Sequence, residues 1–72
     1  MIKLKLKVQL KQILKEKNMT QKELAEKTGL KPSVISEIAN NQRSAINRNY
    51  IELIAAALEI TDIKEILTLA EE

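Results

Sequence analysis

The chain has 72 residues and a formal net charge of +2, and it contains neither cysteine nor histidine. Their absence excludes disulfides and nearly every zinc site, and it removes the usual general base and the most reactive nucleophile of enzymes. A single glycine excludes a glycine-rich phosphate loop, and no apolar run approaches the roughly 18 residues of a membrane span. We therefore expect one small cytoplasmic domain that is no enzyme and binds no cofactor, metal, membrane or small-molecule ligand.

The charges are distributed unevenly along the chain. Residues 1–48 hold eleven Lys or Arg and four Glu, a formal charge of +7, whereas residues 49–72 hold one Lys and six Asp or Glu, a formal charge of −5. This asymmetry suits a protein that meets a polyanion with one side only. A lysine-rich face that is merely solvated is the alternative, so charge alone does not decide for nucleic acid.

Residues 2–6 alternate between apolar and lysine side chains. Ile2, Leu4 and Leu6 share one side, which predicts a short strand with one dry face. A lone strand is unstable, so we expect the apolar segment "ILTLA", residues 66–70, to pair with it. The pairing can form within one chain or between two copies.

The rest of the chain is rich in helix-forming residues. Apolar periodicity predicts five helices, at about residues 7–17, 20–28, 32–40, 48–59 and 62–67. The second has the clearest start, because Thr20 as N-cap and Glu23 three residues later form a capping box. The fold class is therefore mainly α, a five-helix domain with a short strand at residues 2–6.

The only glycine and the only proline lie close together in "KTGLKPS", residues 27–33. Gly29 can take the left-handed conformation that ends a helix at Thr28. Pro32 suits the first position of a new helix, and it pushes Lys31 toward extended geometry. Two helices joined by so short a turn form the helix-turn-helix motif.

The segment "TQKELAEKTGLKPSVISEIANNQR", residues 20–43, resembles the helix-turn-helix of the lambda-repressor-like family of Cro proteins and Xre-type regulators. The matching positions are Gln21, Ala25, Gly29, Ile35 and Ile38. The resemblance covers about residues 6–67, and the leading strand is similar to that of a compact stand-alone subgroup. The resemblance implies a transcriptional regulator that binds double-stranded DNA. We expect it to be a bacterial or phage repressor.

The resemblance also implies which residues meet DNA. In this family the second helix of the motif, here residues 32–40, enters the major groove. The first helix of the motif, here residues 20–28, crosses the phosphate backbone. The expected base-reading residues are Pro32, Ser33, Ser36 and Glu37. The expected phosphate-binding residues are Gln21, Lys31, Asn40, Gln42, Arg43, Arg48 and Asn49.

Two departures from the family pattern qualify this assignment. The usual "NGK" or "NGR" is here "NNQR", so Asn41 must take the left-handed turn that glycine usually takes. The reading face also lacks the Arg, Asn and Gln side chains that make bidentate base contacts. A second function therefore stays open: a protein-interaction module, such as an adaptor, antirepressor or antitoxin, with weak or no operator binding.

A monomer of this size touches few phosphates and binds weakly at physiological salt. Members of the family bind as dimers to half-sites about 34 Å apart. We therefore expect a homodimer, formed through the N-terminal strand or the C-terminal segment. If these two segments pair within one chain instead, they only complete the core.

Overall fold

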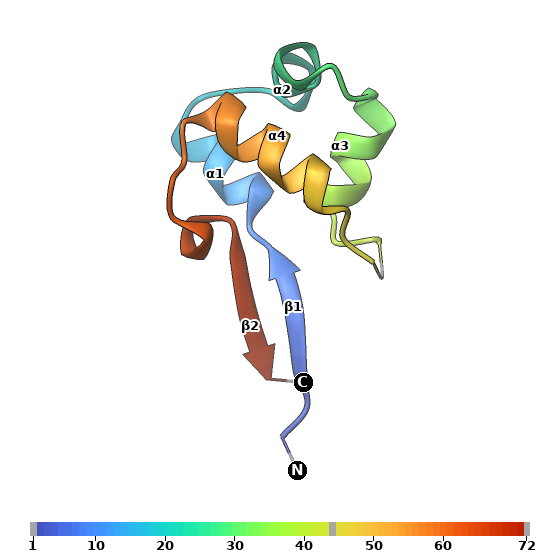
Figure 1. Ribbon diagram of the computed structural model, residues 1–72, viewed down its shortest axis with the longest axis vertical. Helices are drawn as coiled ribbons and strands as arrows, with labels where there is room; N and C mark the ends of the chain where they lie inside the picture. Colours follow the sequence, from blue (N-terminus) through green and yellow to red (C-terminus); the bar gives the residue numbers. More distant parts are fainter. Residues whose placement is uncertain (1, 44, 72) are drawn as a thin grey trace.

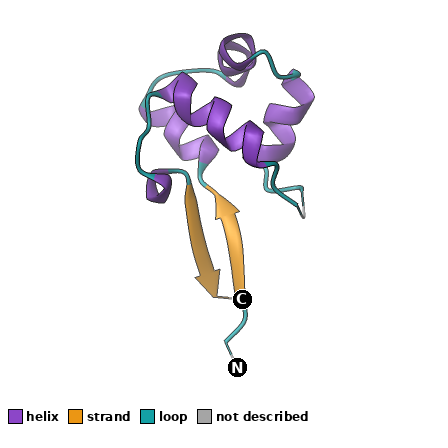
Figure 2. Ribbon diagram, viewed as in Figure 1, coloured by secondary structure: helices purple, strands orange, loops and turns teal. Residues whose placement is uncertain are grey.

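The structure is a computed structural model that describes residues 2–43 and 45–71. In this part of the chain, four α-helices form a body from which a two-stranded antiparallel sheet projects (Figure 1). The elements are β1 (Leu4–Val8), α1 (Leu10–Glu16), α2 (Gln21–Thr28), α3 (Pro32–Ala39), α4 (Arg48–Leu58), the 3-10 helix η1 (Ile63–Glu65) and β2 (Leu67–Glu71). Figure 2 shows that strand is confined to the projecting pair, here called the arm (β1 with β2). The arm lengthens the molecule to 41 Å, against 21 and 20 Å across.

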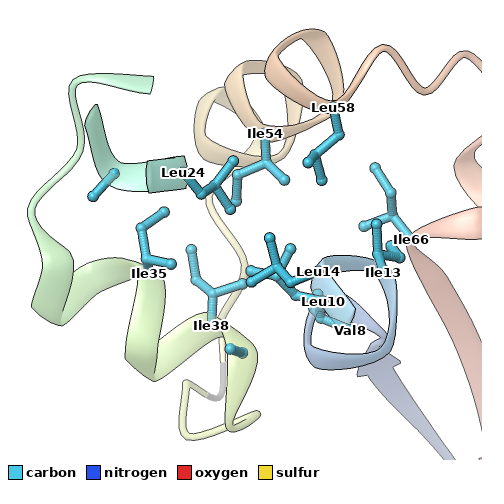
Figure 3. Close-up of a cluster of buried hydrophobic side chains, with 12 residues drawn as sticks. Val8, Leu10, Ile13, Leu14, Leu24, Ile35, Ile38, Ile54, Leu58 and Ile66 are labelled. Atoms are coloured by element: carbon cyan, nitrogen blue, oxygen red, sulfur yellow. The ribbon is translucent and has the colours of Figure 1, made fainter. Parts of the chain in front are cut away.

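The core of the helical body is aliphatic. The largest fully buried side chains are Leu10, Leu24, Ile35, Ile54 and Ile66. Figure 3 shows these side chains converging from α1, α2, α3, α4 and the segment before β2. Burial of each such side chain stabilises the fold by roughly 1.5–3 kcal/mol. The core therefore holds α2 and α3 together, and it fixes which face of α3 remains outside.

The corner between α2 and α3 has the predicted geometry. Thr20 caps α2, because its hydroxyl oxygen accepts a hydrogen bond from the Glu23 amide at 3.1 Å. Gly29 ends α2 in the left-handed conformation at φ 76°, and its amide donates to the Ala25 carbonyl at 2.9 Å. Lys31 is extended at φ −67° and ψ 142°, and Pro32 opens α3. The chain therefore changes direction within three residues.

The prediction of a fifth α-helix at residues 62–67 is wrong. Only Ile63–Glu65 is helical, as a single 3-10 turn. The Asp62 side chain accepts a hydrogen bond from the Lys64 amide at 3.0 Å, which closes a tight turn but does not propagate an α-helix. Leu67–Glu71 then pairs with β1, so tertiary pairing overrides the apolar periodicity of this segment.

The predicted strand at 2–6 and the helix at 7–17 also need correction. The strand is Leu4–Val8 and the helix is Leu10–Glu16. The boundary moves because Lys7 and Val8 pair with Thr68 and Leu67. The other three predicted ranges lie within one residue of α2, α3 and α4.

The two strands pair within one chain. The register aligns Leu4 with Glu71, Leu6 with Leu69 and Val8 with Leu67. Of the two pairings that the sequence left open, the structure contains the intrachain one.

Candidate nucleic-acid interface

The helix α3 has one buried and one outward face. Ile35, Ile38 and Ala39 are buried in the core, and α2 packs against α3. The four residues predicted to read bases lie on the opposite face: Pro32 and Ser33 are exposed, and Ser36 and Glu37 are half-buried. Because positions three and four apart are neighbours on a helix surface, these side chains form one continuous polar row.

One hydrogen bond joins two outward residues along the helix. The Asn40 side-chain amide donates to the Ser36 hydroxyl oxygen at 3.3 Å. The Ser36 hydroxyl remains able to donate, so it can still offer a hydrogen bond to a base acceptor. Asn40 is the C-cap of α3, and its side chain lies directly beside the row.

A guanidinium group lies at the end of this row. Arg43 Nη2 is 2.8 Å from Glu37 Oε2, and both side chains are more than one-third exposed, at 36% and 43%. The Arg43 guanidinium carbon also lies 5.8 Å from the ring centroid of Tyr50. At such exposure the ion pair contributes less than about 1 kcal/mol to stability. Its main effect is to hold Arg43 over α3 and to neutralise Glu37.

The other predicted phosphate-binding residues are distributed around α3. Lys31, Gln42, Arg48 and Asn49 are exposed, and Gln21 is half-buried at the start of α2. Arg48 and Asn49 open α4, where the Asn47 side chain accepts a hydrogen bond from the Asn49 amide at 2.8 Å. The unpaired amides of a helix start attract anions, and Arg48 adds a full positive charge there.

The sequence predicts only a turn at Asn41, and the structure gives its side chain a second role. Its backbone is left-handed at φ 55°, as expected. The side-chain oxygen accepts a hydrogen bond from the Val8 amide at 2.7 Å, and the side-chain nitrogen donates to the Val8 carbonyl at 3.1 Å. Glycine cannot make either bond, which gives a physical reason for asparagine here.

The ring of Tyr50, in the first turn of α4, lies under the Arg43 guanidinium group. This contact depends on how the loop between α3 and α4 closes, and no local sequence pattern signals it. In contrast, the row on α3 could be read directly from the spacing of Ile35 and Ile38. Helical periodicity thus found the row but not the contacts that position Arg43.

The described residues form neither a metal-binding cluster nor a membrane-spanning helix. Within residues 2–43 and 45–71, no three His, Cys, Asp or Glu side chains gather closely enough to hold a metal ion. Among the helices of the same residues, none combines the length and the apolarity that crossing a bilayer requires.

The comparison with known families agrees with this geometry. A short turn between two packed helices, with a polar row on the second, defines a helix-turn-helix domain. A family model described as "Helix-turn-helix" matches residues 10–66, from the start of α1 to the residue before β2. The chain therefore belongs to the Cro/C1-type helix-turn-helix family, a family of DNA-binding regulator domains. No curated protein and no solved structure matches the chain.

Proposed function

We propose that this protein is a repressor that binds double-stranded DNA sequence-specifically, with α3 in the major groove. The observation that carries the proposal is the outward row of Pro32, Ser33, Ser36 and Glu37 on a helix whose other face is buried. Binding alone represses if the site overlaps a promoter, so repression needs no further activity. A bacterial or phage origin and a location in the cytoplasm or nucleoid are part of the proposal.

The row offers three kinds of base contact. Ser33 and Ser36 can donate or accept hydrogen bonds at base edges, and the Pro32 ring can touch a thymine methyl group. Glu37 can accept from the cytosine amino group, but Arg43 already holds its carboxylate. We therefore propose that Glu37 and Arg43 act as one unit, in which Arg43 holds the Glu37 carboxylate and can also reach a nearby phosphate.

Phosphate contacts fix the position of α3 in the groove. We assign them to residues on both sides of α3, namely Gln21, Lys31, Asn40, Gln42, Arg43, Arg48 and Asn49. The arginines should dominate, because each phosphate neutralised by a cation releases counterions and makes the affinity dependent on salt.

Dimerisation belongs to the same proposal. Because β1 and β2 pair within one chain, a second copy needs a surface outside that pairing. We place the contact on the outer edge of β2, where Leu69 is 61% exposed. Sedimentation of the wild type and of Leu69→Pro at tens of micromolar tests this contact, and a monomeric wild type with an intact fold argues against it.

Titration of a fluorescent random-sequence duplex at several salt concentrations tests DNA binding itself. The logarithm of the affinity should fall linearly with the logarithm of salt, and Arg48→Ala should reduce the slope by about one. Lys64→Ala is the matched control, since it removes one positive charge from an exposed side chain in η1. Equal slopes for the wild type and both variants would remove Arg48 from the interface.

Selection from a random-sequence pool tests base reading. We expect Ser36→Ala and Glu37→Ala to change the preferred sequence, whereas Arg43→Ala should weaken all sequences more evenly. Unchanged preference in both of the first two variants contradicts the assignment of the row on α3.

A protein-interaction module is the second candidate function. The observation that favours it is the lack of Arg, Asn or Gln at the four reading positions, together with the pairing of Glu37 to Arg43. An adaptor, antirepressor or antitoxin of this kind should show almost no association with the random duplex even at low salt. The titration described above therefore separates the two functions.

A further inference from the structure

The outer edge of β1 is the side of this strand that faces away from β2. The register shows which residues direct their backbone amide and carbonyl groups toward this edge. The Gln9 amide donates to the Ile66 carbonyl at 2.7 Å, so the backbone groups of Gln9 point toward the β2 side. In an antiparallel pair this direction alternates along the strand. Lys5 and Lys7 therefore bond to β2, whereas Leu4, Leu6 and Val8 direct their backbone groups outward.

Asn41 already occupies one position on this outer edge. Its carboxamide bonds both the amide and the carbonyl of Val8, at 2.7 and 3.1 Å, as a neighbouring strand would. Among the described residues, no further strand lies beside β1 on this side. The amide and carbonyl groups of Leu6 and Leu4 are thus left as the next two places for strand pairing.

A groove lies along the same edge. Its volume is about 580 Å³. Its apolar lining includes Leu4, Leu6 and Val8 of β1 and, from the segment that leads into and begins α4, Ala45, Ile46 and Tyr50, and its polar lining includes Glu37, Asn41 and Arg43. Leu4 and Leu6 are 56% and 45% exposed. An extended segment that paired with β1 would therefore place alternate side chains beside these leucines and against Ile46 and Tyr50.

The two faces of β1 differ in charge. Because side chains alternate along a strand, Leu4 and Leu6 share one face of β1 and Lys5 and Lys7 share the other. Lys5 also borders the groove. A second copy of β1 that kept leucine beside leucine would align Lys5 of one copy with Lys5 of the other. Such like-charge pairs are destabilising, whereas opposite charges across a strand pair are favourable.

We propose that the outer edge of β1 binds an extended segment of a partner protein in which apolar and acidic residues alternate. The backbone of the segment pairs with Leu6 and Leu4, its apolar side chains enter the groove, and its carboxylates face Lys5 and Lys7. This mode of recognition is strand addition to a sheet edge. The residues that carry it, Leu4, Lys5, Leu6 and Lys7, are not assigned to DNA, although Glu37 and Arg43 also line the groove. A peptide-binding assay without DNA therefore distinguishes failure of this proposal from failure of the proposed function.

A labelled eight-residue peptide of four Glu-Val repeats is the probe, with fluorescence anisotropy as the assay on the full chain. The control peptides are Lys-Val repeats and a peptide with the same four glutamates and four valines in two blocks. We expect saturable binding of the alternating acidic peptide only. Equal binding of the block peptide, or no saturable binding of the alternating one, overturns the proposal.

Leu6→Pro removes an outward amide and keeps the amides that bond to β2, so the arm should remain paired. Leu69→Pro makes the same change on the outer edge of β2, directly opposite in the register. We expect Leu6→Pro to lower the affinity for the alternating acidic peptide about tenfold or more. Leu69→Pro should leave this affinity within about twofold of the wild-type value. Equal losses, or equal retention, in two folded variants contradict the assignment to β1.

If Leu6→Pro does not fold, the double variant Lys5→Glu/Lys7→Glu provides the test. Both lysines are exposed, so their replacement should leave the fold intact. The double variant should bind the acidic peptide about tenfold more weakly and should gain binding of the Lys-Val peptide. Unchanged preference overturns the charge argument. A wild-type dimer that Leu6→Pro converts to monomer overturns the proposal in favour of a second copy.

Discussion

The side chain of Asn41 links the loop after α3 to the arm, and this link can be tested by substitution. Asn41→Gly removes both hydrogen bonds to Val8, which together contribute about 2 kcal/mol. Glycine also relieves the left-handed backbone at φ 55°, which gives back up to about 1 kcal/mol. The net expectation is a loss of about 1 kcal/mol. Asn41→Ala has no such relief and should lose about 2–3 kcal/mol.

Asn18 provides a matched control, because it has the same φ of 55°. Within the described residues its side chain makes no hydrogen bond, so Asn18→Gly relieves the backbone and removes nothing else. We expect it to be neutral or to stabilise by up to about 1 kcal/mol. The contrast between the two glycine variants isolates the contribution of the Asn41 carboxamide.

Thermal unfolding followed by circular dichroism measures these differences, since 1 kcal/mol shifts Tm by about 4–8 °C in a domain of this size. Hydrogen exchange of the Val8 amide gives a local readout and should accelerate in both Asn41 variants. If Asn41→Gly raised Tm as much as Asn18→Gly, the bonds to Val8 would contribute nothing to stability.

Three further predictions concern the ion pair, the core and a helix end. Glu37→Gln should free Arg43, strengthen binding to a random duplex and steepen the salt slope by about 0.9, and a slope equal to the wild type in a salt titration would contradict this. Ile35→Ala should lower the free energy of unfolding in urea by about 2–5 kcal/mol and Ile35→Val by about 0.5–1.5 kcal/mol, because the side chain is fully buried; similar losses for both would argue against a tightly packed site. Glu59→Gly should stabilise by up to about 1 kcal/mol in thermal unfolding, because Glu59 is left-handed at φ 57°, and a lower Tm would show that the glutamate side chain matters more than its backbone.

Features set by neighbouring residues were predictable from the sequence. The Thr20 cap and the left-handed Gly29 depend only on residues within one turn of chain, so their spacing predicted both. The polar row on α3 follows from the positions of two buried isoleucines. Local chemistry and helical periodicity therefore sufficed for the motif and for the face it presents.

Features set by contacts between distant residues were not predictable. Asn41 and Val8 are 33 positions apart, and nothing near either residue indicates that they bond. The sequence predicted that residues 66–70 pair with the first strand, but it did not decide between pairing within one chain and pairing between two, and it wrongly predicted a helix at residues 62–67. The pairing of Glu37 with Arg43 likewise depends on the path of the loop after α3.

The pairing of β1 with β2 has a consequence for the order of folding. It joins the first and the last elements of the described chain, so the entropy of closing nearly the whole sequence must be overcome before it forms. The four helices make mostly shorter-range contacts, and we expect them to assemble first. Leu4 and Leu6 remain exposed even in the native state, so the tip of the arm can open without uncovering Leu10 or Ile66. Local opening of the arm should therefore separate β1 from β2 many times for each global unfolding event.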